Sequence, residues 1–138
     1  MKVKLKQVRK NLRPNQVGIV KDFINFLQAN APLRDKVVIL FQDERSETIT
    51  TGKHEDNNIV VFSKSRILID ILRTMAHEWI HALQNQNLVT QPQLEKPSED
   101  HANSVAGFLI RKFVKDNPEH EVEVYKDWFM FYKTFNHE

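Results

Sequence analysis

The five residues from His77 to His81, which read His-Glu-Trp-Ile-His, carry the clearest chemistry in the sequence. On a helix, residues four positions apart lie about 40° apart around the axis and one turn apart along it, so both imidazoles can reach one metal ion. Glu78 lies about 100° from His77, which does not suit a ligand but suits contact with water held at that ion. The spacing therefore predicts a zinc site with His77 and His81 as ligands and Glu78 as general base of a hydrolytic reaction.

The third ligand is limited by the same chemistry, because a catalytic zinc ion usually has three protein ligands and an open position for water. The chain has no cysteine, so this ligand must be a histidine or a carboxylate. Helical periodicity downstream places Glu99 on a face of small residues, with Ala102 and Ala106, that can pack closely on the motif helix. His101 lies about 200° around the axis, on the polar side. We expect Glu99 to be the third ligand; its alternative role is to complement the dipole of a helix N-terminus.

The segment from Glu99 to Ala106 reads Glu-Asp-His-Ala-Asn-Ser-Val-Ala. With the upstream His-Glu-x-x-His pattern, it resembles the zincin metallopeptidases, specifically their glutamate-ligand (gluzincin) branch, and is similar to ImmA/IrrE-like peptidases and other compact zincin-like domains. The resemblance covers about residues 64–114. It implies zinc-dependent cleavage of a peptide or protein substrate. It also implies that Asn103 orients a ligand histidine, and that the strand 59–62 lines the cleft and pairs with an extended peptide.

Periodicity along the rest of the chain predicts one α+β domain over residues 1–138. The expected elements are a strand over 2–8, a helix over 15–30, a strand over 37–42, a hairpin with strands 48–53 and 59–62, a motif helix from Ser63 or Ser65 to Gln86, a helix over 98–116 and a helix from about 119 to 135. We expect a minimal zincin-like domain, in which a small, mostly antiparallel sheet of about three or four strands packs on the central motif helix with about three further helices.

The motif helix is amphipathic in the way that such a site requires. Its apolar residues lie opposite His77 and should anchor it in the core, whereas polar residues share the histidine side. The first group is Leu68, Leu72, Met75, Trp79 and Leu83, and the second is Asp70, Arg73, Thr74, His81 and Gln84.

Charge and composition narrow the classes of partner. The 138 residues include 20 Lys or Arg and 18 Asp or Glu, a net charge of +2, which argues against a dedicated nucleic-acid binder. No apolar run approaches the ~20 residues of a membrane span, and no signal peptide is recognised, so we expect a cytoplasmic protein without membrane contact. Six basic residues fall within positions 1–13. They fit a nucleic-acid arm or, as we favour, an edge strand protected by lysines.

Three functions therefore stand after the sequence alone. The favoured one is a zinc peptidase of narrow specificity or one that acts within a larger assembly. The others are a zincin-fold binding or regulatory module without turnover, and a nucleic-acid-binding protein that uses the basic N-terminal region. The donor that stabilises the oxyanion stays open among His101, His120, Tyr125 and Tyr132.

Overall fold

The structure, a computed structural model, describes residues 3–7, 12–42, 52–55, 58–63, 66–86 and 97–126, and within these the side chains of residues 52–55, 85 and 97–101 are left undescribed. Its elements, in chain order, are β1 (Val3–Lys6), α2 (Pro14–Asn30), β2 (Val37–Gln42), β3 (Gly52–Glu55), β4 (Asn58–Phe62), α3 (Leu68–Asn85), α4 (Pro97–Asp116), the 3-10 turn η1 (Pro118–His120) and α5 (Glu121–Tyr125). The predicted α+β class is confirmed, and so is the predicted size of the sheet.

The sheet has four strands in the order β1-β2-β4-β3. β1, β2 and β4 are mutually parallel, and only β3 runs antiparallel, to β4. The prediction of a mostly antiparallel sheet is therefore wrong. The strands run parallel because α2 connects β1 to β2 as a crossover, which parallel neighbouring strands need. The predicted hairpin is confirmed, but it inserts β4 beside β2 and leaves β3 at the edge.

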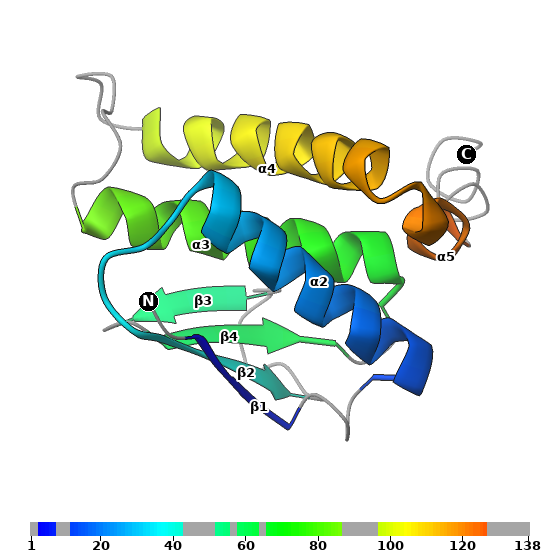
Figure 1. Ribbon diagram of the computed structural model, residues 1–138. Helices are drawn as coiled ribbons and strands as arrows, with labels where there is room; N and C mark the ends of the chain where they lie inside the picture. The colour runs from blue at the N-terminus through cyan, green and yellow to red at the C-terminus, as the bar shows by residue number, and fades with distance from the viewer. Residues whose placement is uncertain are drawn as a thin grey trace, which may run out of the picture.

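The helices form two layers over the sheet (Figure 1). α2 and α3 pack on the sheet, and α4 lies on the side of α3 away from the strands. The core between them contains fully buried side chains from every layer, among them Phe23 and Leu27 of α2, Ile39 and Phe41 of β2, Ile59 and Val61 of β4, and Trp79 of α3. In the described part of the chain, no helix is long and apolar enough to cross a membrane.

β1 is an edge strand, as the alternating lysines predict. Val3 and Leu5 are half-buried and face the helices, whereas Lys4 and Lys6 are exposed on the outer face. The register supports this division, because Leu5 pairs with the buried Ile39.

α3 begins later than predicted and without a serine cap. Its N-cap residue is Ile67, whose side chain makes no capping hydrogen bond. The Ser63 hydroxyl instead donates to the carbonyl of Gln42, while Ser65 lies outside the described residues. The first turn is fixed by Arg66, whose side chain is 3% exposed and donates to the Asp70 carboxylate at 2.8 Å.

The last predicted helix is shorter than its periodicity indicates. α5 ends at Tyr125, because Lys126 adopts an extended conformation with φ −58° and ψ 134°. Within α5 the buried residue is Val124, whereas Val122 is 82% exposed. Residues 127–138, Tyr132 among them, lie outside the described part.

Candidate metal centre

The central element of the candidate site is α3, which is anchored as its amphipathic pattern predicts. The five apolar residues opposite His77 are all at most 3% exposed. Trp79 is fully buried, and its indole N–H donates to the carbonyl of Ala31 at 2.8 Å. The polar side is less open than predicted, since Thr74, Glu78 and Gln84 are buried as well. The helix is thus held rigidly from one side while the histidines occupy the other.

The two motif histidines meet at their Nε2 atoms, which are 3.0 Å apart. Their ring centroids are 4.6 Å apart and the rings are inclined at 79°. Both side chains are half-buried. The structure therefore confirms that the four-residue spacing brings the imidazoles of His77 and His81 to one point.

This separation fits a pair of zinc ligands. With Zn–N distances of 2.0–2.1 Å, two ligands of a tetrahedral ion lie about 3.3 Å apart. The observed 3.0 Å is close to that value, and it also fits a hydrogen bond in which one imidazole donates to the other. The same two nitrogens can therefore share a hydrogen bond or, after a small rotation of either ring, bind one zinc ion.

Gln84 determines which nitrogen of His81 is available. The Nδ1 atom of His81 lies 2.9 Å from the Gln84 side-chain oxygen, which can only accept. Nδ1 must therefore carry the hydrogen, so the lone pair of the neutral ring lies on Nε2, the atom that faces His77. Gln84 is 6% exposed. Sequence reasoning placed it on the histidine side but gave it no role, although its position three residues after His81 was a usable signal.

The resemblance implied a different orienting residue, Asn103. In the structure Asn103 is exposed on α4, whereas Ala102 and Ala106 are fully buried. The contact to the ring of a motif histidine is instead made from within α3, by Gln84 to His81.

Glu78 is 8% exposed, which is rare for a glutamate without a specific role. In the helical register it lies about 60° from His81 and about 100° from His77. The helical register thus puts position 78 on the turn of the two histidines, and its side chain is buried.

Glu99 belongs to α4, but its side chain is outside the description, as is that of His101. α3 and α4 pack along each other, and Figure 1 shows that the end of α3 and the start of α4 lie together at one end of the molecule. The predicted close-packing face is confirmed, because Ala102 and Ala106 are both fully buried. Position 99 shares this helical face by periodicity and lies in the first turn of α4. Among the described side chains, no three His, Asp or Glu residues converge on one point, so Glu99 as third ligand stays a prediction.

Two candidates for the oxyanion donor are placed elsewhere. His120 pairs with Asp22 of α2 at 2.8 Å and stacks on Phe113. Phe113 is 14 residues, or about 21 Å, along α4 from position 99, so His120 stacks far from the start of that helix. Tyr125 lies in α5 at the same far end (Figure 1). Neither therefore suits the role, which leaves His101 and Tyr132.

The strand expected to pair with a peptide is also reassigned. β4 has β2 on one side and β3 on the other, so both of its edges are occupied. The edge strand on this side of the sheet is β3, which packs against α3 together with β4.

The comparisons with known proteins add no relative. A scan against protein-family models, a search of curated proteins and a search of solved structures each find no match for this chain.

Proposed function

We propose that this protein is a zinc-dependent metallopeptidase in which His77, His81 and Glu99 bind zinc and Glu78 is the general base. The observation that carries the proposal is the meeting of two Nε2 atoms at 3.0 Å, with the tautomer of His81 fixed by a buried glutamine. Two surface histidines without a role in metal binding would not require either feature.

The chemistry of the proposed site is divided between the ion and the chain. A bound zinc ion would make a water molecule acidic and polarise a carbonyl oxygen. Glu78 accepts the proton of the attacking water and delivers it to the leaving amine. The burial of Glu78 supports this role, because a partly dehydrated carboxylate is a stronger base than one in bulk water. The buried residues behind α3 keep these groups in place during the reaction.

Substrate binding follows from the position of β3. An extended peptide that adds to the sheet beside α3 can pair with β3, which ends the strand order of the described elements, since β4 has β2 and β3 on its two sides. We propose a peptide or protein substrate bound in this way, with a narrow choice of sequence.

The experiment combines zinc analysis with cleavage of a peptide library followed by mass spectrometry. Glu78→Gln should retain zinc but lose at least about 100-fold in cleavage rate, because only the proton transfer is removed. Glu99→Ala should lose zinc and activity together, whereas His101→Ala should retain zinc. Glu119→Ala, an exposed change in η1, is the matched control and should behave as wild type.

The possible results separate the candidate functions. Zinc without cleavage of any peptide would point to a binding module and contradict the peptidase proposal. Zinc loss in His101→Ala but not in Glu99→Ala would overturn the ligand assignment.

A further inference from the structure

The edge of the sheet opposite β3 has features that the proposed peptidase does not use. β1 ends the strand order and pairs with β2 alone, so within the described elements its outer edge has no strand partner. The backbone N–H and C=O groups along such an edge can pair with an added strand. The edge is short, because β1 has four residues, and it can therefore hold only a short segment.

A groove of about 650 Å³ runs beside this edge, between β1 and α2. Its apolar wall consists of Val3, Leu5, Ile24 and Pro32, and its polar wall contains Lys21 and Asn25. Val3 and Leu5 remain half-buried, although their register partners Val37 and Ile39 are at most 1% exposed. The inward-facing side chains of an added strand could thus enter the groove and contact the partly exposed Val3 and Leu5.

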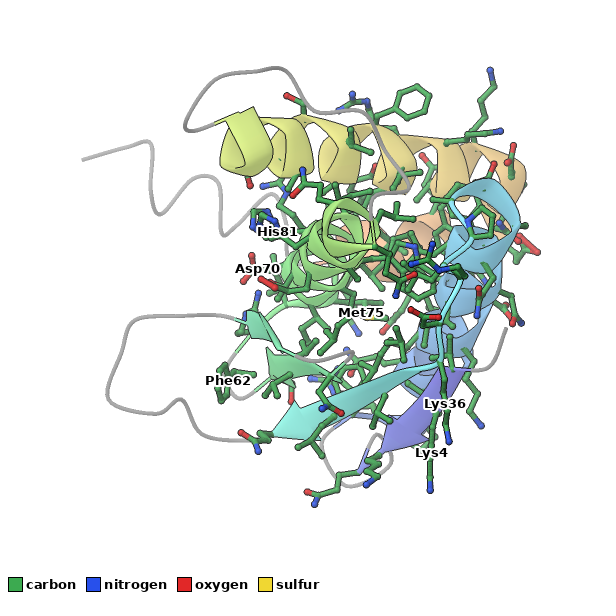
Figure 2. All side chains as sticks on the ribbon, turned by 90° about the vertical axis from the view of Figure 1, so that its left-hand side faces the viewer. Lys4, Lys36, Phe62, Asp70, Met75 and His81 are labelled. Atoms are coloured by element: carbon green, nitrogen blue, oxygen red, sulfur yellow. The ribbon has the colours of Figure 1, made fainter. Side chains whose placement is uncertain are left out.

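The outer face of the same edge is positively charged. Lys4 and Lys6 are exposed on that face, and Lys36 is exposed just before the first residue of β2. Lys4 pairs with Val38, two residues after Lys36, and Figure 2 shows both lysines at the lower right of the view and His81 at the upper left. Among the described carboxylates, Asp22 pairs with His120, and Asp35 lies 3.8 Å from the Arg34 guanidinium.

We propose that β1 and its groove bind an extended acidic segment of a partner protein. In that segment apolar residues alternate with Asp or Glu, because residues of an added strand point in turn into the groove and toward Lys4 and Lys6. A second copy of this chain does not fit, since pairing β1 with β1 would set lysines opposite lysines. The surface is independent of the metal centre and would serve to recruit a substrate protein or a partner subunit.

The test uses a fluorescein-labelled ten-residue peptide that alternates glutamate with valine or isoleucine, titrated with the full chain after treatment with a chelator. Fluorescence anisotropy should report saturable binding. A peptide with proline at alternate positions should bind at least about tenfold more weakly, because it lacks the N–H donors of an added strand. Lys4→Glu with Lys6→Glu should weaken binding by a similar factor. Lys115→Glu, an exposed charge reversal on α4, should leave it unchanged.

Further measurements keep the outcome clear. Circular dichroism shows whether each variant is folded, and Lys4→Gln with Lys6→Gln replaces the charge reversal if it is not. In NMR titrations the amides of residues 3–7 and 21–28 should shift more than those of residues 77–84. Absence of saturable binding, or equal binding by all variants, would overturn the proposal. So would tighter, lysine-dependent binding of a single-stranded oligonucleotide, or a dimer in sedimentation experiments. Because the protein is metal-free here, failure of this test leaves the peptidase proposal untouched.

Discussion

Both ring nitrogens of His81 contact a neighbouring side chain, and these two contacts fix the position of the ring in the candidate site. The Nδ1 hydrogen is engaged by Gln84 at 2.9 Å, and Nε2 faces His77 at 3.0 Å. A ligand histidine whose second nitrogen is bound keeps one tautomer and one ring orientation, which raises its affinity for a metal ion. The affinity for zinc should therefore depend on Gln84 even though this residue is not a ligand.

Gln84→Met tests this dependence, because methionine has a similar length but does not replace the strong acceptor. We expect zinc to bind about 10–100-fold more weakly, as measured by competition with a chelator. Gln84→Glu keeps the acceptor and should restore the affinity. Nitrogen chemical shifts of the His81 ring in the metal-free protein should show a mixture of tautomers in Gln84→Met.

Gln86 offers a matched control, since it is 5% exposed in the same helical turn and its side-chain oxygen accepts from the amides of Arg34 and Asp35. Gln86→Met should lower stability by about 1–3 kcal/mol, because two amides lose their acceptor, but it should not change zinc affinity. An equal loss of affinity in both variants would show that Gln84 acts only through the fold.

At the scale of elements, the site depends on how α4 packs against α3. α3 and α4 pack against each other, and Ala102 and Ala106 on α4 are both fully buried. Small residues allow two helix backbones to approach each other, and a distant α4 could not bring a carboxylate to the histidine pair. The distance between α3 and α4 thus decides whether Glu99 can reach the two histidines.

Ala106→Leu should disturb this separation. Adding atoms to a packed interface costs about 1–3 kcal/mol, and it should also displace position 99 and weaken zinc binding. The measurements are chemical denaturation and chelator competition. Ser104→Leu introduces the same side chain at an exposed position of α4 and should leave both quantities near wild type. Unchanged zinc affinity in a destabilised Ala106→Leu protein would argue against Glu99 as a ligand.

The elements that could be predicted are those whose pattern is local. The apolar stripe of α3 and the small residues of α4 follow from helical periodicity, and the histidine pair follows from helix geometry. Strand direction did not follow, because it depends on whether α2 serves as a crossover between neighbouring strands. The end of α5 was missed because its local pattern continues past Lys126, where the backbone becomes extended. Gln84 was missed because its contact depends on one rotamer, which the three-residue spacing from His81 permits but does not determine.

At the scale of the molecule, the mixed sheet separates two surfaces. The histidine pair lies on α3, which packs against β3 and β4, whereas the groove lies beside β1 at the opposite edge of the described sheet. A protein held at one edge could therefore be recruited without blocking the other.

Zinc should also stabilise the whole fold, because the unfolded chain does not hold the ligands together. With free zinc at about 100 times its dissociation constant, the free energy of unfolding should rise by about 2.7 kcal/mol. Differential scanning fluorimetry with and without zinc measures the corresponding shift in Tm. His81→Ala should lose most of this shift, and Lys115→Glu should keep it. A shift that survives in His81→Ala would indicate that zinc binds elsewhere.

The most direct test of the metal centre is X-ray absorption spectroscopy at the zinc edge on protein loaded with one equivalent of zinc. The account predicts two imidazole nitrogens at about 2.0–2.1 Å and further oxygen ligands from a carboxylate and water. The signal of the two imidazoles should fall to one in His81→Ala. A zinc ion with fewer than two imidazoles in the wild-type protein would contradict the account.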